Sequence, residues 1–327
     1  MVVAACRRRS SRRSRDTDPK SAAAGVIGLT GCGASDLPGQ GPRVLSWSSL
    51  SRMGFMAVEQ RLDGGFVSDV VRVGATVRKS PPRDPAFVRR LLRLFESAGW
   101  TGAPRFLGVD ERGRETLSFV DGVVPWQPGS EPRDDESLAA VARLVRGFHD
   151  VTAGTELAVG GEVVCHNDLS PKNTVYRAGL PVAFIDWDIA AAGRRVQDVA
   201  HVCWQFVPLG PSVDVAVAVA ARRVRLMADA YDGLSPALGV FPMAGPNDDL
   251  SPALGDLSSG DGVSPVLDRG ELVDVVLWWQ NRCWRGIESA AAGGDPAMVR
   301  LRDAGVVGTV RAAYAWTLAH RNALAPE

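Results

Sequence analysis

The chain has 327 residues, of which 46% are hydrophobic and 23% charged, a composition typical of a globular protein with one large or two ordinary domains. Its formal net charge is zero, so composition gives no reason to expect a nucleic acid or an anionic membrane as partner. Five scattered cysteines argue against a disulfide framework and against a zinc site, and no apolar run is long enough to span a membrane. We therefore expect a cytoplasmic protein.

Residues 1–55 are rich in Ser, Arg, Gly and Ala and show no sustained hydrophobic period, which predicts a disordered extension outside the folded unit. Within it, Ala22–Cys32 follows an Arg-rich stretch and resembles a lipoprotein cleavage box. The apolar part is short and rich in glycine, and Asp16 and Asp18 interrupt the basic region, which favours a chance match. The folded part is expected to begin near Met56.

Residues 56–122 have the pattern of a small antiparallel sheet with one helix. The helix is predicted to start at Asp84-Pro85, an N-cap followed by proline, and to run to about Ala98 before Gly99. Short stretches with a β pattern, separated by turns at Gly74-Ala75 and Asp110–Gly113, predict the strands. These strands are Phe66–Val73, Thr76–Lys79, Phe106–Val109 and Glu115–Val120.

Residues 123–327 are predicted to be mainly helical, with a few short strands near their start. The predicted helices are Asp134–Asp150, Val196–Phe206, Val213–Tyr231, Glu271–Ala291 and Val306–Asn322. The predicted strands are Val163-Val164, Thr174–Tyr176 and Val182–Ile185. A Gly/Pro/Asp-rich stretch at 232–268 repeats the sequence Leu-Ser-Pro-Ala-Leu-Gly and is interpreted as a flexible surface insertion. The whole pattern indicates an α+β fold with two lobes.

The most informative segment spans residues 163–188. It places Asp168 and Asn173 at the spacing His-x-Asp-x-x-x-x-Asn, followed by an apolar strand that ends at Asp186. Phosphoryl transfer of the kinase type needs one carboxylate to orient the acceptor hydroxyl, and an amide oxygen with a second carboxylate to hold Mg²⁺. These three residues have the required types in the required order. Two loop aspartates that merely cap turns would not explain the spacing.

The two halves of this segment, His166–Asn173 and Ile185–Asp188, resemble the catalytic and metal-binding motifs of the aminoglycoside phosphotransferase family. The resemblance implies a protein-kinase-like fold and an ATP- and Mg²⁺-dependent transfer to a hydroxyl of a small molecule. It implies that Asp168 is the catalytic base or hydroxyl orienter, that Asn173 and Asp186 are Mg²⁺ ligands, and that His166 braces the loop. Asp188 would be a second acidic residue, which either touches the metal through water or has a structural role. Asp198 is expected to have a structural role, tying the following helix to the loop.

The nucleotide contacts are predicted less sharply. Gly64–Ser68 precedes the first strand, so Gly65 and Ser68 are candidates for a turn over the phosphates. An ordinary hairpin would have the same glycines. Backbone groups of Phe119 and Val120, at the end of the last N-terminal strand, could meet an adenine edge.

Kinase-like enzymes also hold the α- and β-phosphates with a basic residue on a strand of the sheet. Arg78 and Lys79 are the candidates, and only one of them can point inward because neighbours alternate faces. The resemblance favours Arg78, which follows an apolar residue. The following helix departs from the family pattern, because Glu96 near its end is its only acidic residue.

The acceptor cannot be read from the sequence. The C-terminal helices mix acidic and basic residues, and their tryptophans are more typical of a core than of a ligand platform. Two other functions compete with a small-molecule phosphotransferase. A non-catalytic nucleotide-binding regulatory protein of the same fold is favoured by the helix without the expected glutamate. A protein kinase is disfavoured, because helical pattern resumes at Val196 and leaves no room for a long activation segment.

Overall fold

The structure, a computed structural model, describes residues 59–62, 70–126, 130–211, 215–233 and 267–326. All of them fall within one unit of the chain. The predicted extension at 1–55 and nearly all of the predicted insertion at 232–268 lie outside the described residues. The proposed boundary between two lobes near residue 122 stays a prediction.

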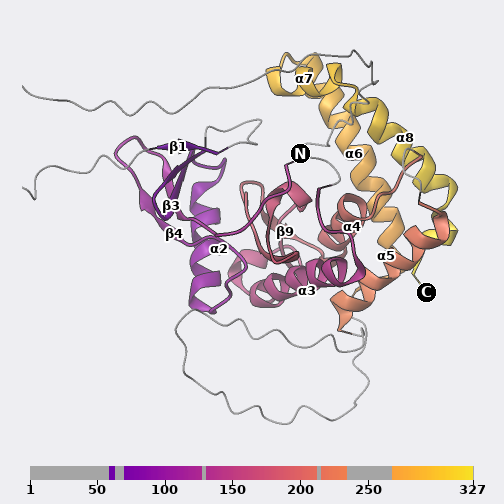
Figure 1. Cartoon of the computed structure of the whole chain (residues 1–327), viewed down its shortest axis with the longest axis horizontal. Coiled ribbons are helices and arrows are strands. Elements are labelled where there is room, and N and C mark those ends of the chain that lie inside the picture. Colours follow the sequence, from indigo (N-terminus) through magenta and orange to yellow (C-terminus); the bar gives the residue numbers. More distant parts are fainter. Residues whose placement is uncertain (1–58, 63–69, 127–129, 212–214, 234–266, 327) are drawn as a thin grey trace, which may run out of the picture. The chain divides into compact units, whose positions relative to one another are not determined.

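A five-stranded antiparallel sheet forms the N-terminal part, with the strand order β1-β2-β3-β5-β4 (Figure 1). Its strands are β1 (Gln60–Arg61), β2 (Val71–Val73), β3 (Thr76–Lys79), β4 (Phe106–Val109) and β5 (Glu115–Ser118). Strand β3 therefore lies in the middle of the sheet, with β5 beside it. A central position is the one from which a side chain can reach a buried site next to the sheet.

Helix α2 (Pro85–Ser97) lies beside this sheet, as Figure 1 shows. The Asp84 side chain caps it by accepting a hydrogen bond from the Phe87 amide at 3.1 Å, and Pro85 occupies the first turn. Gly99 follows its end with a φ of 70°, a left-handed conformation that suits glycine. The apolar face of α2 is buried and faces the core through Leu91 and Phe95.

Two short antiparallel strand pairs and a group of helices follow. Strand β6 (Val163–Cys165) pairs with β9 (Ala191–Gly193), and β7 (Thr174–Arg177) pairs with β8 (Leu180–Phe184). The longer helices are α3 (Asp135–Thr152), α4 (Arg195–Phe206), α5 (Val217–Asp232), α6 (Leu272–Ala292), α7 (Pro296–Asp303) and α8 (Val306–Ala319). Short helical turns are η1 (Glu156–Ala158), η2 (Pro171–Asn173) and α9 (Arg321–Leu324).

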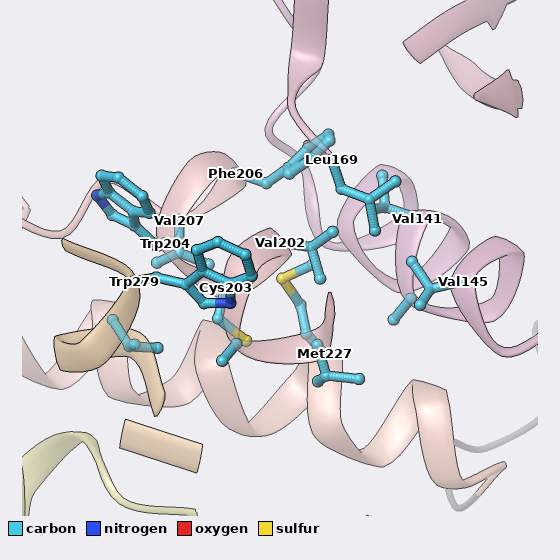
Figure 2. Close-up of a cluster of buried hydrophobic side chains, with 14 of the residues drawn as sticks. Val141, Val145, Leu169, Val202, Cys203, Trp204, Phe206, Val207, Met227 and Trp279 are labelled. Atoms are coloured by element: carbon cyan, nitrogen blue, oxygen red, sulfur yellow. The ribbon is translucent and has the colours of Figure 1, made fainter. Parts of the chain in front are cut away.

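The core of the helical part reaches the motif predicted to be catalytic. Leu169, which follows Asp168, is fully buried and points toward Phe206 of α4 and Val141 of α3 in Figure 2. Val145 and Met227 belong to the same buried cluster. The loop that carries Asp168 is thus anchored in the core by its own next residue, which restricts where Asp168 can lie.

The predicted fold class, α+β with an antiparallel sheet followed by helices, is confirmed. Some elements differ from the prediction. The expected last helix is divided at His320 into α8 and α9, and helix α7 and strand β9 were not predicted. Of the first predicted strand, Phe66–Val73, the structure describes Val70–Val73, and β2 covers Val71–Val73 of it.

Candidate functional site

The loop between β6 and β7 brings Asp168 and Asn173 together. The Asn173 side-chain nitrogen donates to Asp168 Oδ2 at 3.0 Å and to the Asp168 backbone oxygen at 2.8 Å. The single helical turn η2 folds the chain back so that these residues meet. Both donations use the amide nitrogen, which leaves the amide oxygen as the atom that could face a cation. Lys172 adds positive charge, with its Nζ 3.9 Å from Asp168 Oδ2.

His166 holds the same loop against the end of β8. Its Nε2 lies 3.1 Å from the Ile185 carbonyl oxygen, and its Nδ1 accepts from the Asp168 amide at 3.3 Å. These partners require a neutral ring with the proton on Nε2, because a carbonyl can only accept and an amide N–H can only donate. Burial lowers the pKa of His166, which favours the same neutral form. The structural role predicted for His166 agrees with this placement.

Asp198 of α4 holds the backbone of the loop that carries Asp168. Its two carboxylate oxygens accept from the His166 amide at 2.7 Å and the Asn167 amide at 3.0 Å. Burial alone would raise the pKa of the Asp198 carboxyl, but the hydrogen bonds from His149 and the loop amide hold it below its ordinary value. This fully buried carboxylate therefore fixes the backbone just before Asp168.

A chain of polar contacts extends from Asp198 to the surface. His149 Nε2 lies 3.2 Å from Asp198 Oδ2, and its Nδ1 lies 2.7 Å from the Tyr231 hydroxyl. Arg195 donates to that hydroxyl at 3.1 Å and to Asp150 at 2.8 Å. Each side chain in this hydrogen-bonded series fixes the next one, which is typical of a rigid support rather than of a reacting group.

His149, Cys165 and Asp198 offer possible metal ligands within 4.8 Å of one another. All three are already engaged by protein groups. The Cys165 thiol lies 3.3 Å from the Arg194 carbonyl oxygen, and burial raises its pKa, which disfavours the thiolate that metals bind. The arrangement fits the bracing role described above.

Asp186 lies beside the Asp168 loop at the end of β8. The Ile185 amide donates to the Asn173 carbonyl at 2.9 Å, so the residue before Asp186 is bonded directly to Asn173. Asp186 and Asn167 have positive φ angles of 67° and 66°. Such left-handed non-glycine residues carry backbone strain, and they gather at functional sites where the surrounding structure enforces them. Asp168, Asn173 and Asp186 are thus brought to one place by loop and strand end together.

Lys79 connects this place to the N-terminal sheet. Its ammonium lies 2.7 Å from Asp186 Oδ1 and 2.6 Å from Asp188 Oδ1. Burial works against the charge of Lys79, but the two carboxylates outweigh it and raise the pKa of the ammonium. Burial likewise opposes the charge of Asp186, and Lys79 lowers the pKa of that carboxyl in spite of it. The site therefore contains a buried lysine bridging two acidic residues.

The resemblance favours Arg78 over Lys79 as the basic residue that faces the site, but in the structure it is Lys79 that faces it. Arg78 leaves β3 on the opposite face, where its guanidinium donates to the Thr76 hydroxyl and lies 3.8 Å from Asp110. The physical reason is the alternation of a strand, which allows only one of two neighbours to face the site. Lys79 is that residue, with 7% of its surface exposed.

The other predicted nucleotide contacts are placed only in part. Gly65 and Ser68 lie outside the described residues. The Phe119 amide donates to the Ala75 carbonyl at 2.9 Å, and the Phe119 ring lies 3.7 Å from the Arg72 guanidinium. The Phe119 N–H is therefore already used within the sheet, which leaves Val120 and the Phe119 carbonyl as candidates for an adenine edge.

One acidic residue near the site was missed. Glu115, the first residue of β5, is almost fully buried and accepts from Arg89 of α2 at 2.8 Å. Glu96, the only acid within α2, instead lies 3.7 Å from Arg105 near the surface. No sequence motif marks Glu115, because its position directly opposite Lys79 follows only from the register of β3 and β5.

Part of the C-terminal aromatic set also belongs to the core. Trp279 is buried and donates to the Gln197 carbonyl at 2.7 Å, and its ring lies 4.7 Å from that of His201. Burial lowers the pKa of His201 to about 4, so this ring adds no charge at neutral pH. Trp278, by contrast, is 45% exposed. The predicted core role fits Trp279 and does not fit Trp278.

Two comparisons with known proteins bear on the family. The family model described as "Phosphotransferase enzyme family" matches residues 156–236, the stretch that contains Asp168, Asn173 and Asp186. A trifolitoxin immunity protein from Rhizobium leguminosarum bv. trifolii is 36% identical over 197 residues, which are 53% of this chain and 74% of that protein. The chain belongs to the phosphotransferase enzyme family. The family predicted from the two motifs is thereby confirmed.

The solved structures to which this chain is similar include three phosphotransferases. An aminoglycoside phosphotransferase from Alicyclobacillus acidocaldarius is 14% identical, covers 88% of this chain and 98% of its own, and has a TM-score of 0.46. A macrolide 2'-phosphotransferase from Brachybacterium faecium is 13% identical, with coverages of 76% and 90% and a TM-score of 0.44. A choline/ethanolamine kinase family protein from Mesorhizobium loti is 14% identical, with coverages of 81% and 94% and a TM-score of 0.43. At these values none of them indicates what this phosphotransferase family member acts on.

Along the described part of this family member, each helix is either too short or too polar to cross a membrane.

Proposed function

We propose that this chain transfers the γ-phosphate of Mg·ATP to a hydroxyl group of a small molecule, in the cytoplasm. The observation that carries the proposal is the convergence of four side chains. Asn173 is bonded to Asp168, Asp186 follows a strand end bonded to Asn173, and Lys79 reaches Asp186 from the sheet. Family membership supports phosphoryl transfer as the reaction class.

Asp168 is the proposed acceptor-binding group. As a carboxylate it accepts a hydrogen bond from the acceptor hydroxyl, orients the oxygen toward the γ-phosphorus and takes up the proton as the new P–O bond forms. Asn173 holds Oδ2 of Asp168 at 3.0 Å, so the carboxylate is fixed in orientation. Positioning of this kind supplies much of the rate enhancement in phosphoryl transfer.

The donor set beside Asp168 fits a magnesium ion. The Asn173 amide oxygen and the Asp186 carboxylate are oxygen ligands, which Mg²⁺ prefers, and the strained backbone at Asp186 shows that its position is enforced. Asp188 is the proposed further acidic residue near the ion. When bound, the ion would neutralise charge on the nucleotide phosphates. Lys79 is the proposed contact to the α- and β-phosphates, since its ammonium is the basic group that the sheet directs here.

The acceptor class can be tested directly. Purified protein is incubated with Mg·ATP and a panel of aminoglycosides, macrolides, choline-like alcohols and sugar derivatives, and ATP consumption is compared with that of Asp168→Ala. We expect one class to raise consumption by the wild type only. The same consumption by wild type and variant, with product formed in both, would refute the role of Asp168.

A toxin is the second candidate acceptor, because the relative at 36% identity is named as a trifolitoxin immunity protein. Phosphorylation of a toxin hydroxyl would inactivate it without any change in the chemistry proposed above. Adding purified trifolitoxin to the panel tests this. Mass spectrometry would show a phosphorylated toxin if the candidate is right and an unmodified toxin if it is wrong.

A non-catalytic nucleotide-binding regulator remains the alternative from another class. It is favoured by helix α2, whose first turn lacks an acidic residue. Such a protein would bind ATP without transferring phosphate to any member of the panel. The bonded pair of Asp168 and Asn173 favours the enzyme, because a regulator has no use for an oriented carboxylate.

A further inference from the structure

The charges around Lys79 are arranged in reverse of the pattern expected for a kinase-like sheet. There, an acid on the helix pairs with the lysine on the strand. Here the helix α2 carries a base, Arg89, and the acid, Glu115, lies on strand β5. Arg89 Nε is 2.8 Å from Glu115 Oε1, and Glu115 has only 1% of its surface exposed. A buried carboxylate is thus held in place by the helix.

Glu115 is the residue directly opposite Lys79 in the antiparallel pair of β3 and β5. Residues that face each other across such a pair project to the same side of the sheet, with Cβ atoms about 4.5–5.5 Å apart. Both side chains are buried. The buried side chain of Glu115 therefore lies next to the start of the Lys79 side chain, whose ammonium reaches the proposed phosphate site.

The charges around Lys79 indicate what Glu115 could do. In the structure two cations, Lys79 and Arg89, face three carboxylates, those of Glu115, Asp186 and Asp188. If Asp186 and Asp188 both turn to a bound metal ion, as proposed above, Lys79 loses its two ion-pair partners. A buried ammonium without a nearby negative charge would be strongly unfavourable. Glu115 is the carboxylate of the three that stays beside Lys79, on the neighbouring strand.

We propose that Glu115 is a positioning residue that keeps Lys79 directed at the nucleotide phosphates, and that Arg89 of α2 holds Glu115 in place. This inference rests on the proposed function. A merely structural salt bridge between α2 and β5 would behave differently, because its loss would lower stability without changing the nucleotide affinity of the folded protein.

The test is a double-mutant cycle on the full chain, with ATP affinity measured by calorimetry in the absence and presence of Mg²⁺. Glu115→Gln removes the charge but keeps an oxygen that can accept from Arg89. We expect it to weaken ATP binding at least about tenfold, the loss typical of a charge-assisted interaction. In a Lys79→Gln background the same change should have no further effect, because Glu115 acts through Lys79. Glu96→Gln, an exposed acid of α2, is the matched control and should bind like the wild type.

Three outcomes separate the possibilities. Wild-type affinity in Glu115→Gln would overturn the inference, and so would a loss that adds in full to that of Lys79→Gln. A wild type that does not bind ATP would overturn the proposed function and this inference with it. If Glu115→Gln does not fold, Arg89→Met serves instead, because it removes the contact that holds Glu115 in place. It should weaken ATP binding by at least about threefold, as expected for loss of an indirect contact, and wild-type affinity in a folded Arg89→Met would overturn the inference.

Discussion

Replacing Asp198 by asparagine tests the support of the catalytic loop. The carboxylate accepts from the amides of His166 and Asn167 and from the His149 ring. An amide at this position can accept through one oxygen only, and its NH₂ group would face a donor. About two charge-assisted hydrogen bonds are lost, at roughly 1.5–3 kcal/mol each, so we expect a loss of about 3–6 kcal/mol in unfolding free energy. That is a large part of the stability of a typical domain.

Urea unfolding at pH 7 measures this loss as a lower transition midpoint. Asp135→Asn is the control, since Asp135 forms an exposed ion pair with Arg222 and its loss should cost less than about 1 kcal/mol. Turnover of Asp198→Asn should fall much more than its ATP affinity, because displaced amides move Asp168 away from the acceptor. If Asp198→Asn is no less stable than Asp135→Asn, the bracing role is wrong.

The stability difference between wild type and Asp198→Asn should also depend on pH. The pKa of Asp198 is lowered in the folded protein by its hydrogen bonds, so its contribution is complete above the pKa of an unfolded aspartate, about 3.9. The contribution is lost as pH falls from there through the lowered folded value. Unfolding curves at pH 7 and at successively lower pH should therefore converge for the two proteins. A difference that grows on acidification would contradict this sign.

Three further predictions concern the site and its support. Lys79→Met should weaken Mg·ATP binding about tenfold or more, because a charged phosphate contact is lost. Arg78→Met, next to it on the strand, should bind Mg·ATP like the wild type. Calorimetry compares the two variants, and equal losses of affinity would contradict Lys79 as the phosphate contact. Asp186→Asn should remove most of the Mg²⁺-dependent part of ATP affinity, and an unchanged response to Mg²⁺ would exclude Asp186 as a ligand. Leu169→Ala should lower the unfolding free energy measured in urea by about 3 kcal/mol. Leu318→Ala, on an exposed helix face, should lower it by less than about 0.5 kcal/mol. Similar losses for both variants would show that Leu169 does not anchor the loop.

The sequence predicted those elements whose local signals agree with their tertiary setting. Strands Thr76–Lys79 and Phe106–Val109 have the predicted bounds, because clear turns flank them, at Gly74-Ala75 before the first and at Asp110–Gly113 after the second. Helix α2 begins where Asp84 and Pro85 predict it. Helix α7 begins with the same signal, Asp295 before a proline, and could have been found in the same way. Strand β9 has three small residues and depends on its pairing with β6, which no local pattern reveals.

In the site, too, some residues were predictable from local sequence and others were not. The spacing of Asp168 and Asn173 was sufficient to predict that they meet, because five residues and a proline-led turn bring them together. The choice between Arg78 and Lys79 was not predictable, since alternation shows that one faces inward but not which one. Glu115 carries no motif, and its relation to Lys79 depends on the register between two strands that are distant in sequence.

The central claim is that Asp168 directs a phosphoryl transfer. Its most direct test is the transfer of the γ-phosphate from labelled ATP to the acceptor found in the panel, with wild type and Asp168→Asn compared at saturating Mg·ATP and equal protein concentration. We predict labelled acceptor with the wild type, at least about a hundredfold less with the variant, as for loss of an acid–base group, and similar ATP affinities for both. Equal labelling by the two proteins would contradict the account.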